Sequence, residues 1–201
     1  MSLSPRRVIL AITGASGAIL GIRTLELLRE CGGIETHLVI SAAARQTISL
    51  ETGWSVADVK ALADVCYDPR QISAHIASGS FVTEGMLVVP CSIKTLSGIA
   101  NSYANDLIVR AADVCLKEGR KLILALREAP LHKGHLRLMQ QAAEAGAVIF
   151  PAVPAFYAGH QTMDELVTDL AGRLLLRMGI ENEAYSRWEG EDIEDSDSNG
   201  A

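Results

Sequence analysis

The stretch Val8-Ile9-Leu10-Ala11-Ile12-Thr13-Gly14-Ala15-Ser16-Gly17 contains an aliphatic run and the loop that follows it. Consecutive aliphatic residues are typical of a strand that is covered on both faces of a parallel sheet. The small residues from Gly14 to Gly17 then lead into a segment with helical periodicity. The first N–H groups of a helix lack partners within it and carry the positive end of its dipole, so such a junction can bind a phosphate.

A second junction of the same kind follows Met86-Leu87-Val88-Val89. Its loop, Pro90-Cys91-Ser92-Ile93-Lys94-Thr95, again places small and hydroxyl-bearing residues between a strand and a helix. The pair predicts a phosphorylated cofactor or substrate that lies across the carboxyl edge of a parallel sheet. Taken alone, the first loop is explained about as well by a plain tight turn, because it has neither the GxGxxG pattern nor a Gly-Lys-Ser/Thr sequence.

Composition sets the broad class of the protein. The chain has 201 residues, of which 49% are hydrophobic and 21% charged, as expected for one globular domain. The net charge of -6 argues against a nucleic-acid-binding surface but not against a locally basic pocket. No apolar run approaches the length of a membrane span, and Pro5-Arg6-Arg7 does not begin a signal peptide, so we expect a cytoplasmic protein.

Strands that alternate with helices predict a doubly wound, Rossmann-like and mostly parallel sheet in a three-layer α/β/α arrangement. Residues 1–188 are expected to form a single flavin-binding-type α/β domain, and the acidic residues 189–201 a disordered tail. The segment 53–84 is interpreted as a lid over the first loop, and Ser41 and Ser92 as helix N-caps. Strands are expected at 8–12, 35–40, 86–89, 122–126 and 147–150, and helices at 17–29, 42–50, 55–63, 71–77, after Ser92, 106–118, 134–145 and 162–178.

Several charged and aromatic residues are candidates for binding an anion. Arg127 and Glu128 follow the predicted strand 122–126, where side chains face the ligand crevice, although a surface ion pair is the alternative. Arg110 and Lys117 share one helix face, and each could reach a phosphate or belong to a solvated basic stripe. The Tyr157 hydroxyl could also bind an anion.

Other residues have simpler interpretations. Arg173 lies among leucines, which indicates an ion pair at an interface. Glu51 closes the predicted helix 42–50 and is expected to face solvent. His132 and His135 lack a third metal ligand, so no metal site is predicted. The four cysteines show no metal-ligand spacing and are expected to be free thiols, with Cys91 a small buried residue rather than a nucleophile.

Together, six motifs resemble the flavin prenyltransferase family of the UbiX/Pad type, whose members are also described as components of phenolic or hydroxyaryl acid decarboxylases. The likeness covers residues 8–188. The motifs are Gly14-Ala15-Ser16-Gly17-Ala18, the stretch from Pro90 to Gly98, Arg110-Ala111-Ala112-Asp113-Val114, Leu116-Lys117-Glu118, Arg127-Glu128-Ala129-Pro130 and Pro154-Ala155-Phe156-Tyr157.

The resemblance implies a metal-independent prenyltransferase. Members join a dimethylallyl group, typically from dimethylallyl monophosphate, to reduced FMN. The product, prenylated FMN, serves a UbiD-type partner decarboxylase in ubiquinone synthesis or in aromatic-acid decarboxylation. The resemblance also implies a homododecamer with its active sites at subunit junctions.

The same resemblance implies roles for individual residues. FMN would be held by Gly14, Ala15, Ser16, Ser41, Ser92, Ile93, Lys94, Thr95 and Arg127. The prenyl phosphate would be held by Lys117, Arg127, Tyr157 and Arg173, with Arg110 in support. Glu51 and Glu128 would manage protons, and Ser16 would lie near the reacting centre. The implied catalytic set is therefore Ser16, Glu51, Glu128, Lys117 and Arg110.

Two other functions remain open from the residues. One is a non-catalytic, FMN-binding subunit of a phenolic-acid decarboxylase. The other is an FMN-dependent cysteine-type decarboxylase, for which a catalytic histidine after the first helix is expected. The nearest histidine here, His37, lies inside a predicted strand, which disfavours the second alternative.

Overall fold

The computed structural model describes residues 6–188 and 190, so the predicted acidic tail, apart from Gly190, lies outside the described residues. These residues form a six-stranded sheet in the order β3-β2-β1-β4-β5-β6, and every strand pair is parallel. The predicted doubly wound fold is confirmed. The strands are β1 (Arg6–Ile12), β2 (Ile34–Ile40), β3 (Val65–Tyr67), β4 (Gly85–Cys91), β5 (Lys121–Leu126) and β6 (Val148–Pro151).

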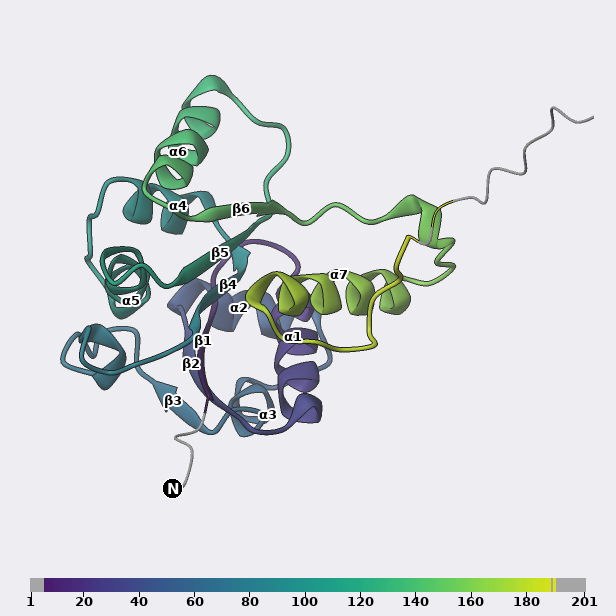
Figure 1. The fold of residues 1–201 in the computed structure, drawn as a ribbon, viewed down its shortest axis with the longest axis horizontal. Coiled ribbons are helices and arrows are strands. Elements are labelled where there is room, and N and C mark those ends of the chain that lie inside the picture. Colours follow the sequence, from purple (N-terminus) through teal and green to yellow (C-terminus); the bar gives the residue numbers. More distant parts are fainter. Residues whose placement is uncertain (1–5, 189, 191–201) are drawn as a thin grey trace, which may run out of the picture.

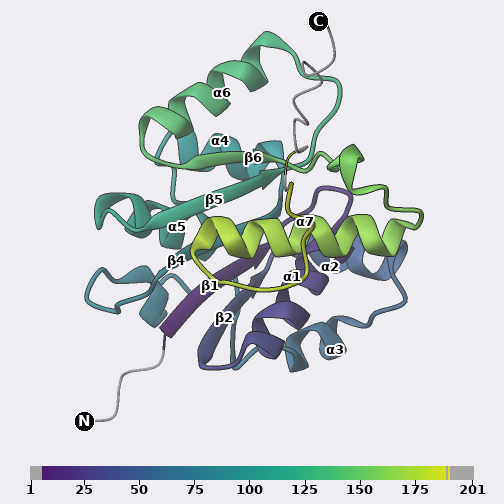
Figure 2. The ribbon, with the colours of Figure 1, turned by 45° about the vertical axis from the view of Figure 1, so that its right-hand side comes forward.

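Helices cover both faces of the sheet (Figure 1). One face packs against α1 (Ala18–Cys31), α2 (Ala42–Glu51), α3 (Val56–Ala61) and α7 (Met163–Met178). The other packs against α4 (Ile93–Ala100), α5 (Leu107–Lys117) and α6 (Lys133–Glu144). Figure 2 shows α7 lying along the sheet, on the side opposite α4, α5 and α6. The core is aliphatic, as the low aromatic content of 4% predicts.

The winding of the chain reverses between β1 and β4, which are neighbours in the sheet although two strands separate them in sequence. In doubly wound sheets this switch point leaves a crevice at the carboxyl ends of the strands. The first loop singled out in the sequence follows β1 directly, whereas the second begins within β4, which includes Pro90 and Cys91, and continues through Ser92 into α4. The topology therefore places both loops side by side at the switch point.

Helix N-caps agree with the sequence. The Ser41 hydroxyl accepts a hydrogen bond from Ala44 N, and the Ser92 hydroxyl accepts one from Thr95 N. Thr162 caps α7 in a reciprocal capping box with Glu165. The predicted caps at Ser41 and Ser92 are confirmed. Each cap joins residues three apart in the chain, so its spacing is visible in the sequence.

The segment 53–84 contains the main differences from the prediction. The strand β3 was not expected, because three residues are too few to show a hydrophobic period. The predicted helix at 71–77 is wrong, since only the 3₁₀ turn η1 (His75–Ala77) forms there. Ala74 and Ile76 are both buried although they are two residues apart, and a helix cannot turn such a pair toward the same side.

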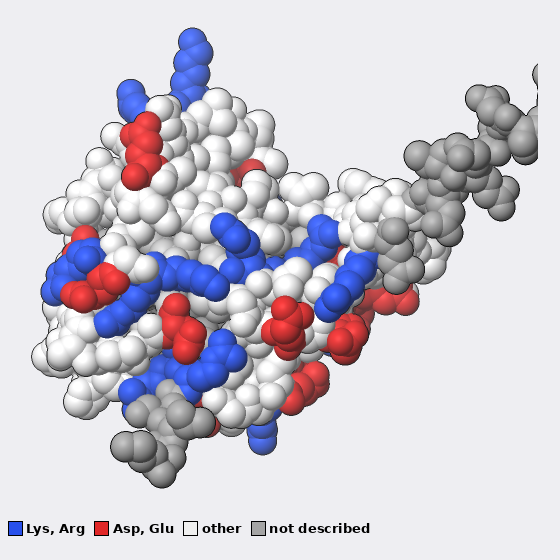
Figure 3. Space-filling model, in the orientation of Figure 1, with Lys and Arg blue, Asp and Glu red and all other residues white. Residues whose placement is uncertain are grey.

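Charged side chains of both signs share the surface. Figure 3 shows lysines and arginines in several groups on one face, with aspartates and glutamates between them. Local clusters of basic side chains therefore exist although the net charge is -6. Among the described helices, none is long and apolar enough to cross a membrane.

Candidate active site

Thr13 fastens the two loops at the switch point to each other. The residue is 1% exposed, its hydroxyl donates to the Pro90 carbonyl at 2.6 Å, and the same oxygen accepts from Ser92 N at 2.8 Å. Ser41 N donates to the Ile12 carbonyl at 3.0 Å and ties the end of β2 to the same point. The carboxyl ends of β1, β2 and β4 thus form one rigid junction.

A cavity of about 490 Å³ opens at this junction. Five of the predicted cofactor-binding residues line it, namely Gly14, Ser41, Ser92, Lys94 and Thr95. The N-termini of α2 and α4 start at the capping residues Ser41 and Ser92, so two positive helix ends lie at the cavity wall. A cavity of this size with helix N-termini in its wall suits a phosphorylated small molecule.

Further lining residues were missed by the sequence reasoning, namely Pro69, Arg70, Asn105 and Asp106. Pro69 and Arg70 come from the segment interpreted as a lid, and they form part of the cavity wall. The rest of that segment supplies α3, which packs on the face of the sheet that α1 and α2 cover, the edge strand β3, and the turn η1, which packs against α5. A turn signal at Asp68-Pro69-Arg70 was visible in the sequence, but its proximity to Ser41 was not.

Gly14 allows the first loop to approach α2 closely. A Cβ atom at this position would lie 2.4 Å from the Cβ of Ala43, well inside van der Waals contact. Glycine is therefore required at this point of the cavity wall.

We expect Gly14→Ala to weaken FMN binding about tenfold or more, because the added methyl group must push the first turn of α2 away from the loop. Titration of FMN fluorescence measures the dissociation constant. Gly53→Ala, at a position with open space around its Cβ, is the matched control and should bind FMN normally. Wild-type affinity in Gly14→Ala would show that the loop does not contact the cofactor.

The end of the first loop contacts Glu51. Gly17 adopts the left-handed conformation with φ 100°, and its N–H donates to Glu51 Oε2 at 2.7 Å. Ser16, one residue before, is exposed, while Ala15 is buried. Glu51 is exposed, as expected, but its carboxylate also binds the loop that precedes α1. Because Glu51 and Gly17 are 34 residues apart, nothing in the sequence indicated this contact.

Arg127 and Glu128 follow β5 at the same edge of the sheet. Arg127 N donates to the Cys91 carbonyl at 3.3 Å, which places this pair beside the second loop. Both side chains are exposed, and Glu128 Oε1 accepts from Ala129 N at 3.1 Å. Within residues 6–188, neither side chain forms an ion pair, so the alternative of a surface ion pair is wrong.

Lys117 does not reach the cavity within its own chain. The helix α5 begins at the cavity, where Asp106 and Val109 line it, and Lys117 ends the helix. Eleven residues at 1.5 Å each place Lys117 about 16 Å from Asp106 along the axis. Its ammonium contacts Glu118 and lowers the pKa of that carboxyl group.

Arg110 also faces away from the cavity. Its Nε donates to the Ala77 carbonyl at 3.2 Å, and its guanidinium pairs with Asp113 at 3.2 Å. The expectation that Arg110 and Lys117 share one phosphate is therefore not met by a single chain. Arg110 is held by Asp113 and by the backbone of η1, and Lys117 is held by Glu118 at the end of α5.

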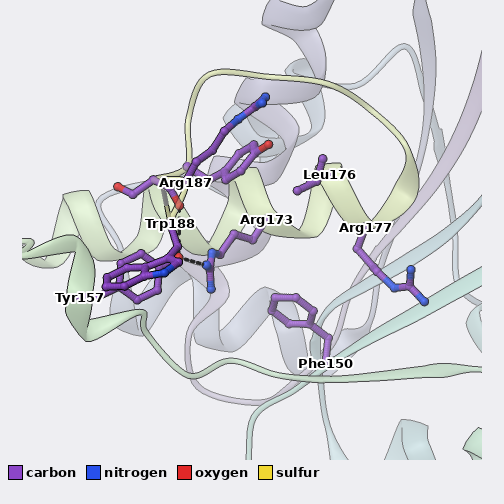
Figure 4. A pocket seen from close by; sticks show the side chains of 9 residues that line it. Phe150, Tyr157, Arg173, Leu176, Arg177, Arg187 and Trp188 are labelled. Carbon is purple, nitrogen blue, oxygen red and sulfur yellow. Dashed lines mark hydrogen bonds between the residues drawn. The ribbon is translucent and has the colours of Figure 1, made fainter. Parts of the chain in front are cut away.

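Tyr157 and Arg173 meet at a second cavity of about 590 Å³, whose lining also includes Phe150, Arg177 and Trp188 (Figure 4). The Arg173 guanidinium donates to the Tyr157 hydroxyl, and Tyr157 packs edge-on against Trp188 with ring centroids 5.2 Å apart. The predicted grouping of Tyr157 with Arg173 is thus present. The structure brings them together at a cavity that shares no lining residue with the first.

The remaining candidates have structural roles in the described chain. Cys91 and Cys115 are buried, and burial raises the pKa of each thiol to about 12, so Cys91 is no nucleophile at neutral pH. His132 Nδ1 accepts from Gly134 N at 3.0 Å and caps α6. Within the described residues, no cluster of three or more His, Cys, Asp or Glu side chains could hold a metal ion.

Comparison with known proteins establishes the family. Residues 1–175 match the Flavoprotein family. The flavin prenyltransferase UbiX of Escherichia coli (strain K12) is 57% identical over 187 residues, which cover 92% of this chain and 99% of that protein. This chain belongs to the flavin prenyltransferase family. The predicted family and enzyme class are confirmed.

Two solved structures share the fold of this chain. The structure of AnUbiX (PadA1) in complex with FMN and dimethylallyl pyrophosphate superposes with a TM-score of 0.92 at 46% identity, over 94% of this chain and 100% of that one. The dodecameric FMN-dependent UbiX-like decarboxylase of Escherichia coli O157:H7 superposes with a TM-score of 0.90 at 48% identity, over 92% of this chain and 100% of that one.

Proposed function

We propose that this flavin prenyltransferase transfers a dimethylallyl group from dimethylallyl monophosphate to reduced FMN and so produces prenylated FMN. The observation that carries the proposal is the cavity at the switch point, where the loops after β1 and β4 are locked together by Thr13. Family membership at 57% identity supports it independently.

The residues of the first cavity fit FMN. Gly14 lets the backbone approach a ligand, and the N-termini of α2 and α4 supply partly positive N–H groups for a phosphate. The Ser41, Ser92 and Thr95 side chains add hydroxyl groups at the wall. When bound, reduced FMN supplies the electron-rich ring that accepts the prenyl group. Ile93, Lys94, Ala15 and Ser16 belong to the same two loops and complete the proposed cofactor site.

The Tyr157–Arg173 pair fits the leaving phosphate. Breaking the allylic C–O bond leaves the electron pair on a phosphate oxygen, and charged and hydroxyl donors stabilise that developing charge. Arg173 and Tyr157 present such donors side by side at the second cavity. Arg127, at the end of β5, would add a further cation at the carboxyl edge. No metal is needed for this neutralisation.

Glu128 fits the role of proton carrier. It is an exposed carboxylate at the carboxyl edge of the sheet and has no cationic partner among the described residues. A carboxylate placed at this edge is a candidate general acid–base group. Glu51 instead shapes the site, because it holds the N–H of Gly17 next to Ser16.

We further propose a homododecamer in which neighbouring subunits complete each active site. Within one chain, neither Lys117 nor Arg110 lines either cavity. The family resemblance nevertheless implies that both residues act at the prenyl phosphate. A second copy could bring them to the site. The dodecameric state of the Escherichia coli O157:H7 relative supports this assembly.

The product would be consumed by a decarboxylase that uses prenylated FMN. We propose a UbiD-type partner enzyme, in ubiquinone synthesis or in aromatic-acid decarboxylation, and a cytoplasmic location. The partner does not have to bind this chain stably, because a released cofactor can diffuse to it.

An anaerobic incubation with reduced FMN and dimethylallyl monophosphate tests the activity. Mass spectrometry of the released flavin should show FMN heavier by one isoprenyl unit. A parallel reaction with dimethylallyl diphosphate identifies the preferred donor. Unchanged FMN with both donors, in protein that still binds FMN, would contradict prenyl transfer and favour a non-catalytic FMN-binding subunit.

A further inference from the structure

Asp169 is a carboxylate buried in the middle of α7. Its side chain is 2% exposed, and a buried carboxylate is costly unless charged or polar partners surround it. Oδ1 accepts a hydrogen bond from Ser186 N at 2.8 Å and lies 3.4 Å from His160 Nε2. Oδ2 has no hydrogen-bond partner among the described residues and lies 3.6 Å from Arg173 Nε. The free oxygen of Asp169 therefore faces Arg173.

Arg173 connects Asp169 to the second cavity. One end of its guanidinium faces the Asp169 carboxylate, while the other donates to the Tyr157 hydroxyl. Figure 4 shows Arg173 extending from α7 toward Tyr157 and Trp188. The Tyr157 hydroxyl in turn donates to the Ser186 carbonyl at 3.3 Å. Asp169 thus holds both Arg173 and the chain segment that carries Trp188.

We propose that Asp169 is a positioning residue that orients Arg173 toward the prenyl phosphate without touching the substrate itself. An arginine side chain on a helix has many rotamers, and a fixed carboxylate at its Nε selects the one that points the terminal N–H groups at Tyr157 and the cavity. A pre-oriented guanidinium binds an anion more tightly than a mobile one. The inference rests on the proposed function, because it takes the phosphate as the ligand of Arg173.

A purely structural role for Asp169 makes a different prediction. Its Oδ1 could serve only to anchor Ser186, and the charge would then be dispensable. Asp169→Asn separates the two roles, because asparagine keeps an oxygen that accepts from Ser186 N but removes the negative charge beside Arg173. Asp164→Asn is the matched control, since Asp164 lies on the same helix but is exposed and pairs with Arg23 instead.

The test measures binding of dimethylallyl monophosphate to protein loaded with oxidised FMN, by isothermal titration calorimetry. We expect Asp169→Asn to raise the dissociation constant about tenfold, with unchanged FMN affinity and unfolding midpoint. Arg173→Gln should raise it at least as much. The double variant should be no worse than Arg173→Gln alone, because Asp169 acts through Arg173. Asp164→Asn should bind like the wild type.

Wild-type affinity in Asp169→Asn would overturn the inference, and so would additive losses in the double variant. If Asp169→Asn does not fold, Asp169→Glu replaces it in the same cycle, since it keeps the charge but moves it by one methylene group. If the losses of affinity caused by Asp169→Glu and Arg173→Gln are not additive, the inference is supported, and if they are additive, it is overturned. If the wild type binds dimethylallyl monophosphate but does not transfer the prenyl group, the proposed function is contradicted, while the comparison of Asp169 and Arg173 variants remains valid. If the wild type does not bind dimethylallyl monophosphate at all, the inference is overturned.

Discussion

Glu128→Gln is expected to lower the turnover number of prenyl transfer by roughly 10²- to 10⁴-fold, while FMN affinity stays within about twofold of the wild type. Glutamine preserves the size and hydrogen-bonding capacity of the side chain but cannot accept a proton near neutral pH. Glu128 lies in the loop after β5 and does not line the proposed FMN cavity. The substitution should therefore separate proton handling from cofactor binding. Quantification of prenylated FMN by mass spectrometry, alongside an FMN titration, measures both quantities.

Glu144→Gln is the matched control for this experiment. Glu144 is an exposed carboxylate on α6 that accepts a hydrogen bond from Gln140, so its replacement should leave both turnover and FMN affinity unchanged. Near-normal turnover in Glu128→Gln would remove Glu128 from the proton-handling role. Loss of FMN binding in the same variant would instead assign it to the cofactor site.

Two inactive variants are expected to restore each other's activity when they assemble together. Lys117→Ala and Arg173→Ala should each lose most prenyl transfer, because each removes a cation from the proposed phosphate site. If every site takes Lys117 from one subunit and Arg173 from another, an equal random mixture regains about a quarter of wild-type activity, since half of the subunits supply each intact residue. Co-expression of the two variants with different tags, followed by double-affinity purification and assay, measures the recovery.

The control for complementation is co-expression of two differently tagged copies of Lys117→Ala, in which no site can contain Lys117. That assembly should remain inactive. A mixed assembly of Lys117→Ala and Arg173→Ala that also remains inactive would show that both residues act from one subunit. The distance of Lys117 from the start of α5 would then require a rearrangement of the helix.

Local patterns in the sequence were sufficient for the fold class and for the two binding loops. The aliphatic runs before Thr13 and Ser92 indicate buried parallel strands, and the small residues that follow indicate helix starts. The caps at Ser41 and Ser92 depend on hydrogen bonds across three residues. All of these features depend on neighbours along the chain, and for that reason they could be predicted.

Short elements escaped the same reasoning. The strand β3 has three residues, and its pairing with β2 depends on where the chain returns after α3. The segment at 71–77 has a helix-like composition, but Ala74 and Ile76 alternate into the core and hold it as a turn. Tertiary packing thus overrides local helix propensity in this segment, where backbone hydrogen bonds such as Ala74 N to the Gln71 carbonyl and Ala77 N to the Ala74 carbonyl span three residues, as in turns.

By itself the sequence determined the doubly wound sheet, its carboxyl-edge loops and, through six motifs, the enzyme family. Only the tertiary structure decided which distant residues meet. It placed Glu51 on Gly17, used Thr13 to join the loops after β1 and β4, and set Asp169 behind Arg173. It also showed that Lys117, which the motifs group with the other site residues, lies at the far end of α5 from the cavity at the switch point. The physical reason is that such contacts depend on the path of the backbone between residues far apart in sequence, which no local period or cap records.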